Sequence, residues 1–385
     1  MIPVEQKNTL KVLRSPNLKL KSKHSWIVIP LLLIVIVPSS FQRVGLQLNE
    51  SFKTFALFDP NNFITSLFHY ESLNNKFLKF IILKFTSIST ATFLPLFLLT
   101  IAEILRKKGN LRERFNLTSL GRVQYTEGYK GAEFWYLFLN IITGKFPILL
   151  TFLTVGYSSL ISGATKGFSA WITKLSDIVF PSNINTFQLT ILFILSILVT
   201  DLIGYINHWI HHNIGLFWDL HEFHHSATEM NIMCRNRVLP IESIFLDFLR
   251  LPFSVFLGLI IIKGLATGST VILSIQIIHT ALSLSADIFG HSSLKIIYPK
   301  PISYFIMSPA CHWLHHSINP EHYNCNFGIT YTFWDRIFGT YLDESHIENI
   351  NGFGVVNTQY NKHHPIYSMY FLPLSKILRR FRKVH

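Results

Sequence analysis

The chain has 385 residues, of which 49% are hydrophobic, only 14% are charged, and 34 are phenylalanine. Soluble globular domains carry far more charge, so the composition excludes an ordinary soluble domain and indicates a membrane protein. The net charge is +13. Because the basic residues gather beside apolar runs, this charge indicates membrane topology and contact with anionic lipid headgroups, and it argues against nucleic-acid binding.

Residues 1–24 are expected to form a basic cytosolic tail. They hold six Lys and Arg side chains and precede the apolar run from Trp26 to Pro38, and basic flanks of apolar runs favour the cytosolic side. A signal peptide is the weaker alternative, because no small-residue cleavage site follows the run. The run is also shorter than the roughly 20 residues that cross the hydrocarbon.

Six apolar segments predict about six membrane spans or re-entrant segments, and four of them lie within residues 25–206. They are Trp26–Pro38, Phe77–Leu105, Phe134–Ile161, Phe187–Ile206, Ile244–Leu265 and Thr270–Ala286. The basic loop after the second segment should be cytosolic and the weakly charged loop after the third should lie outside. Counting crossings then places the chain after the fourth and sixth segments on the cytosolic face. The sequence therefore predicts an all-α, multi-pass helical bundle with a membrane hairpin at residues 244–286.

Histidines follow these segments in three clusters with the spacing of metal ligands. His208 and His212 lie four residues apart, and the strings HEFHHS (residues 221–226) and HWLHHS (residues 312–317) share the frame HxxHH. On a helix these offsets put imidazoles on one face, where they can converge on a metal ion. A catalytic zinc ion takes about three protein ligands and a structural one about four, so eight histidines predict two ions. Imidazole suits iron, zinc, copper and nickel alike, so the spacing does not name the metal.

Two other readings of these histidines fit less well. A single buried histidine is usually a hydrogen-bonded core residue, but eight in three phased clusters are hard to explain in that way. A pH sensor is also conceivable, although protonating so many neighbouring imidazoles would be costly.

The residues from Asp201 to Tyr341 resemble the fatty acid hydroxylase superfamily, also called the sterol desaturase family, of integral-membrane di-iron enzymes. The resemblance is carried by three boxes and by the closing motifs at residues 326–328 (AsnPheGly) and 334–340 (TrpAspArgIlePheGlyThr). The boxes are Asp201, Tyr205, His208 and His212; Trp218, His221, His224, His225 and Ser226; and Pro309, His312, His315, His316 and Ser317.

This resemblance implies a helical membrane base under a cytosolic helical cap that holds two iron ions. It also implies hydroxylation or desaturation of a lipid substrate within the bilayer, with dioxygen as cosubstrate. Residues 207–345 would be the catalytic region and residues 346–385 a basic cytosolic tail. An external electron-transfer protein must supply electrons, because the chain shows no flavin, haem or iron–sulfur motif.

The predicted metal ligands are nine histidines, of which His291 is added because it matches a histidine of the family. They are His208, His212, His221, His224, His225, His291, His312, His315 and His316. Asp201 is the predicted catalytic residue outside this set. A carboxylate in an apolar span is costly to bury, so Asp201 is expected to hold a ligand imidazole. Asp335 and Arg336 are expected to form a structural ion pair.

Two alternative functions use the same histidines. A zinc-dependent membrane hydrolase would act through metal-activated water and would need no reductant. A metal transporter would place its sites near the middle of the bilayer, whereas these clusters follow the ends of apolar segments. The favoured prediction is an integral-membrane lipid monooxygenase or desaturase. Its metal site would face the cytosol, in a bacterial inner membrane or the endoplasmic reticulum.

Overall fold

The computed structural model describes residues 174–382 without a gap and part of the chain between residues 97 and 143. In the latter part it covers residues 97, 100, 101, 103–105, 108–125, 128, 129 and 131–143. The described residues are helical and form no β-sheet, apart from two isolated bridges that pair Ile306 with Tyr331 and Ser317 with Phe353. The predicted all-α class is confirmed for this part of the chain.

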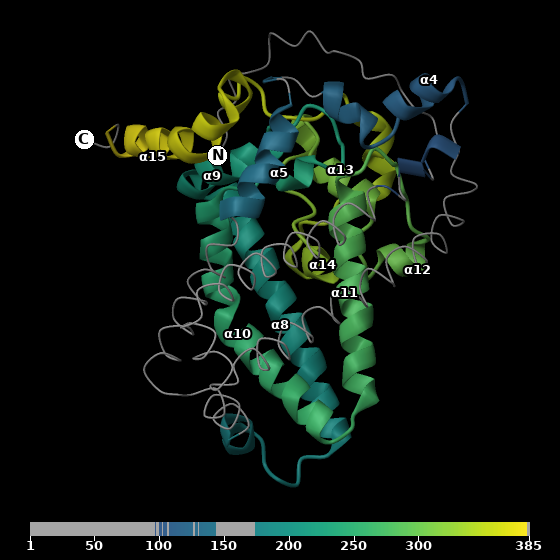
Figure 1. Ribbon diagram of the computed structural model, residues 1–385, viewed down its shortest axis with the longest axis vertical. Helices are drawn as coiled ribbons and strands as arrows, with labels where there is room; N and C mark the ends of the chain where they lie inside the picture. Colours follow the sequence, from purple (N-terminus) through teal and green to yellow (C-terminus); the bar gives the residue numbers. More distant parts are fainter. Residues whose placement is uncertain are drawn as a thin grey trace, which may run out of the picture.

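Three long helices form the body of the molecule (Figure 1): α8 (Thr186–Asn213), α10 (Pro240–Ala266) and α11 (Thr270–Gly290). Both α8 and α11 are long and apolar enough to cross a membrane, and α10 adds a third span if its two arms are counted together. The described residues thus account for two or three of the six expected spans. The first expected segment and most of the second and third lie outside the described residues.

Local sequence explains where these helices begin, bend and end. Asn185 and Gln188 form a reciprocal capping box at the start of α8, which satisfies backbone amides that have no partner within the helix. Pro252 lies inside α10, and the arms on either side differ in direction by 56°. Proline bends a helix because it lacks an N–H and crowds the preceding turn. Residues 267–269 then join α10 to α11.

Shorter helices lie around the upper part of the long helices in Figure 1. These are α4 (Leu111–Asn116), α5 (Ala132–Thr143), α9 (Gly215–His225), α12 (Lys300–Ser303), α13 (Pro309–His315), α14 (Phe333–Phe338) and α15 (Leu372–Arg382). Short 3₁₀ turns lie between them at Gly121–Tyr125, Cys234–Asn236, Pro320–His322, Glu344–Asn349 and Tyr360–Lys362, and a π-helical turn, Tyr367–Phe371, precedes α15.

Arg237 joins three parts of this end of the molecule. The side chain is fully buried, and its Nε donates to Glu133 Oε1 of α5 at 2.8 Å. Its Nη1 donates to Ser226 Oγ at the end of α9 (2.5 Å) and to Asn361 Oδ1 (2.7 Å). A buried guanidinium is tolerated only when it is paired and hydrogen-bonded, so these contacts fix the three segments relative to one another.

The residues after 345 pack against α9. Arg380 Nε and Nη2 bind the two carboxylate oxygens of Asp219 at 2.7 and 3.0 Å, and Lys376 pairs with Glu222. Two basic residues of the expected C-terminal tail, Lys376 and Arg380, therefore form ion pairs with α9.

Candidate metal centre

The first histidine group consists of His208, His212, His221, His225 and His315. The helix α8 carries the first two, α9 the next two and α13 the last. One ring nitrogen from each lies within 4.8 Å of every other. The extended backbone of Ile214 lets the chain turn between α8 and α9, so the i,i+4 pairs of the two helices face each other.

The second histidine group consists of His224, His291, His312 and His316. His291 Nε2 lies 3.2 Å from His224 Nε2 and 3.1 Å from His312 Nε2. His316 Nε2 lies 3.1 Å from His312 Nε2. Four ring nitrogens thus converge on one small volume.

Each HxxHH frame is divided between the two groups. In α9, His221 and His225 join the first group while His224 joins the second. In α13 and at its C-cap, His312 and His316 join the second group while His315 joins the first. The three imidazoles of one frame therefore do not all face the same group. Residues at i and i+4 share a helix face more closely than those at i and i+3, and adjacent residues differ by about 100°. Two helices crossing at one point can in this way supply two neighbouring sites.

Three imidazoles of the first group are held through Nδ1. His208 Nδ1 lies 2.9 Å from the Phe327 carbonyl oxygen, and His315 Nδ1 lies 2.7 Å from the Cys325 carbonyl oxygen. His221 Nδ1 lies 2.6 Å from Glu242 Oε1. An imidazole that donates its Nδ1–H to an oxygen keeps a lone pair on Nε2, and this arrangement typically orients a histidine toward a metal.

Four inward-pointing nitrogens of the first group have no protein partner among the described residues. The Nε2 atoms of His212, His221, His225 and His315 are buried and make no hydrogen bond within the described residues. Burying an unpaired polar atom costs about 1–3 kcal/mol, so four in one place call for an explanation. A metal ion coordinated by these lone pairs supplies one, and imidazole donors suit iron, zinc and copper. The histidines present therefore fit a metal at each group.

The protonation state agrees with this fit. Burial, followed by the neighbouring imidazoles, lowers the pKa of His224, His225, His312 and His316 well below the ordinary histidine value. Burial lowers the pKa of His315 to about 3. These side chains are neutral at physiological pH, which is the state in which imidazole binds metal.

Asp201 lies away from both histidine groups. It is buried in α8, and its Oδ2 accepts a hydrogen bond from Trp334 Nε1 at 3.0 Å, so among its described contacts there is no imidazole.

The expectation that Asp335 and Arg336 form an ion pair is wrong. Asp335 instead accepts from the backbone amides of Phe327 (2.7 Å) and Gly328 (2.9 Å), which holds the loop whose carbonyl binds His208.

Sequence reasoning did not find Glu242 or the two carbonyls that hold the first group. Glu242 is a carboxylate at the start of an apolar run, and that was a usable signal. The carbonyl oxygens of Phe327 and Cys325 belong to the backbone, so the residue types at these positions do not reveal their role. His211, which adjoins His212, belongs to neither group, and its Nδ1 lies 2.7 Å from the Asn207 carbonyl oxygen.

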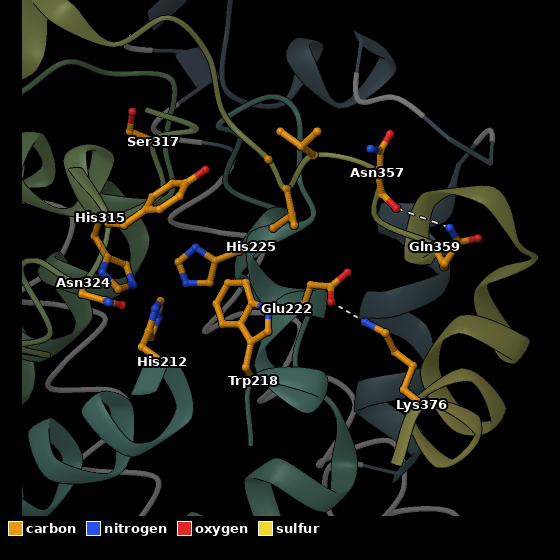
Figure 2. Close-up of a pocket in the computed structure, with 14 residues that line it drawn as sticks. His212, Trp218, Glu222, His225, His315, Ser317, Asn324, Asn357, Gln359 and Lys376 are labelled. Atoms are coloured by element: carbon orange, nitrogen blue, oxygen red, sulfur yellow. Dashed lines mark hydrogen bonds and ion pairs between the residues drawn. The ribbon is translucent and has the colours of Figure 1, made fainter. Parts of the chain in front are cut away.

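A cavity of about 280 Å³ adjoins the first group (Figure 2). His212, His225 and His315 line one side. The rest of the wall combines polar and apolar groups and is made of Trp218, Glu222, Ser317, Tyr323, Asn324, Gly354, Val355, Val356, Asn357, Gln359 and Lys376. A space of this size is near the lower end for ligand sites, so it can hold a polar headgroup but not a whole lipid.

Residues 193–340 match the family model described as fatty acid hydroxylase. The resemblance predicted from the histidine boxes is thereby confirmed, and this stretch carries a fatty acid hydroxylase domain. Together with its apolar helices, the match identifies an integral membrane protein.

Curated relatives include alkylglycerol monooxygenases. The chain is 26% identical to that of Caenorhabditis elegans over 169 residues, or 42% of this chain and 30% of the relative. It is 25% identical to that of Xenopus tropicalis over 140 residues, or 36% of this chain and 28% of the relative. It thus matches less than a third of the length of these relatives. No solved structure matches this chain.

Proposed function

We propose that this protein is a di-iron membrane monooxygenase that hydroxylates a lipid. The observation that carries the proposal is the pair of adjacent histidine groups, with four buried and unpartnered Nε2 atoms in the first, inside a fatty acid hydroxylase domain. The first group would hold one iron through His208, His212, His221, His225 and His315, and the second group would hold the other through His224, His291, His312 and His316. Bound iron supplies the activation of dioxygen.

The protein's own residues hold and protect this centre. Glu242 and the carbonyls of Phe327 and Cys325 fix three imidazoles of the first group before metal arrives. Burial of both groups excludes bulk water, which protects an oxidising site from side reactions. Insertion of one oxygen atom into a C–H bond while the other becomes water consumes two electrons and two protons. An external electron-transfer protein would provide them.

A lipid with a small polar headgroup is the substrate class that we propose, and an alkylglycerol is the first to test. Three of the curated relatives are alkylglycerol monooxygenases. The cavity beside the first group supports a headgroup that forms hydrogen bonds, since the polar side chains of Glu222, Asn357 and Lys376 are part of its lining. The hydrocarbon chain would then extend toward the apolar helices. We further propose that the histidine end of the molecule faces the cytosol.

The test uses the full chain, loaded with iron in lipid nanodiscs that contain an alkylglycerol, a free fatty acid or a sterol. With ¹⁸O-labelled dioxygen and a reductant, mass spectrometry should find label in the alkylglycerol product. A newly unsaturated product without label would make the enzyme a desaturase. Product formed without dioxygen and reductant by zinc-loaded protein would overturn the proposal in favour of a hydrolase.

A further inference from the structure

The segment from Thr330 to Thr340 packs against the middle of α11 rather than against its end. The Tyr331 hydroxyl lies 3.1 Å from His279 Nδ1, and Thr330 Oγ1 lies 3.0 Å from Ser283 Oγ. His279 precedes the last residue of α11, Gly290, by 11 positions, which corresponds to about 16 Å of helix.

The same segment reaches equally far along α8. Trp334 Nε1 donates to Asp201 Oδ2 at 3.0 Å, and the Tyr205 hydroxyl lies 2.8 Å from Thr340 Oγ1. Asp201 precedes the last residue of α8, Asn213, by 12 positions, or about 18 Å. Because α8 and α11 are the two candidate membrane spans, these contacts place the segment at a depth where the spans are apolar.

Large apolar side chains at this depth point away from the protein. Tyr304, Phe305, Ile337 and Phe338 are 51%, 57%, 64% and 54% exposed, and we call them the α12–α14 patch. The two segments that carry them are joined by hydrogen bonds from Thr332 N to the Phe305 carbonyl oxygen (3.0 Å) and from Arg336 Nε to the Tyr304 carbonyl oxygen (3.3 Å). In Figure 1, α14 lies between α8 and α11, and α12 lies beside α11, both below α13.

Positive charge borders the patch. The Arg336 guanidinium stacks over the rings of Tyr304 (4.4 Å) and Tyr341 (3.6 Å), and Lys300 is exposed at the start of α12. Aromatic residues with neighbouring cations are the typical composition where a protein meets the headgroup border of a bilayer.

We propose that the α12–α14 patch inserts into the bilayer leaflet on the side of the histidine groups, with its aromatic and aliphatic side chains among the upper parts of the acyl chains. The occupant of this surface is membrane lipid, because the surroundings of the spans at the depth of Asp201 and His279 are hydrocarbon. Transferring exposed apolar surface out of water is favourable by about 25 cal/mol per Å².

The patch also lies close to the first histidine group. Phe338 stacks on Tyr205 with ring centroids 5.2 Å apart, and Phe327 lies 6.1 Å from Tyr205 and 5.6 Å from His208. Lipid that surrounds the patch is thus separated from the metal ligands by two layers of aromatic side chains. The insertion itself does not depend on which reaction the centre performs.

The test measures lipid contact without turnover. An Ile337→Cys variant of the full chain is labelled with a small fluorophore, which the three native cysteines should not take up because they are buried. Single copies are placed in nanodiscs that contain phospholipids with a nitroxide at a shallow position of the acyl chain. The control is Leu111→Cys in α4, whose native side chain is 64% exposed, as is that of Ile337.

The label at position 337 should be quenched several-fold more strongly by the nitroxide lipids than the label at position 111, and less strongly by iodide in the buffer. Equal quenching at the two positions by either agent would overturn the proposal. Protection of position 337 from both agents would also overturn it, because the surface would then be covered by protein. A Phe305→Cys label should repeat the result, which guards against a local effect of the first substitution.

Discussion

The two histidine groups use the same side chain but are supported differently. In the first group, His208, His221 and His315 are each held through Nδ1 by a carbonyl or a carboxylate. In the second group, His291 is held by the Asp287 carbonyl oxygen at 2.8 Å, whereas His224 Nδ1 is buried without a partner in the described part of the chain.

For the proposed metal centre, this difference predicts that the first group is organised before metal binds and that the second is organised by the metal. Converging Nε2 atoms at 3.1–3.2 Å can share protons in neutral pairs, but a cation that binds all four lone pairs stabilises them more completely. The first group also faces the cavity, so its geometry bears directly on where a substrate lies.

Removing a ligand that faces the cavity should have the largest effect. His315→Ala should lower turnover at least about 100-fold, because even the loss of partners outside the ligand shell typically costs 10–100-fold. Turnover and membrane insertion are measured together, and insertion should be unchanged. His211→Ala, a buried histidine outside both groups, is the control and should retain metal. Loss of insertion in the His315 variant would assign this residue to folding instead.

Removing a ligand of the second group should show most clearly in metal content. His291→Gln should reduce bound iron toward one ion per chain and turnover to below about a tenth, because only three imidazoles remain and no preformed support compensates. Metal analysis of the purified protein checks this. Normal iron content with slower turnover would place His291 outside the ligand set.

Releasing one support of the first group should have a smaller effect. Glu242→Ala should weaken metal binding about tenfold, the lower end of the range for partners of ligating histidines, because His221 loses its acceptor. Competition with a chelator measures the affinity. Glu229→Ala removes a carboxylate that pairs with Arg122 and touches no imidazole, so it should bind metal normally.

The smallest effect is expected from a substitution that loosens the loop of Phe327 and Gly328, whose carbonyl contacts His208. Asp335→Asn replaces one acceptor oxygen by a donor facing the amides of Phe327 or Gly328, which should destabilise the protein by about 1–3 kcal/mol. Thermal unfolding in detergent reports this change. Iron bound by the second group should be unaffected, and an equal loss from both groups would contradict the proposed independence of their supports.

Spacing in the sequence could single out eight of the nine grouped histidines but not their division between the two groups. The offsets of His208 with His212 and of the two HxxHH frames are visible without a structure, because imidazoles at i and i+4 share a helix face. His224 and His315 each belong to a different group from the other histidines of their own frame. This division depends on how α9 and α13 cross. The placement of α9 depends on long-range contacts such as those of Arg237 with Glu133 and Ser226, which no local pattern contains.

Hydropathy located the apolar segments but not the chain that lies beside them. The runs from Phe187 and from Thr270 coincide with α8 and α11. The return of residues 330–340 along these helices was not expected, because the segment is short and carries Asp335 and Arg336. Its depth follows from individual hydrogen bonds to Asp201 and Ser283, and such pairings depend on the tertiary arrangement.

Because α10 is bent, α10 and α11 extend nearly the same distance along the bundle although α10 has more residues. At 1.5 Å per residue, the 27 residues of α10 would extend about 40 Å if straight, whereas the 21 residues of α11 extend about 32 Å. With its first arm turned by 56°, α10 advances only about 32 Å along its second arm. The hairpin therefore begins and ends at nearly the same height, and Glu242 and His291 reach the two histidine groups side by side.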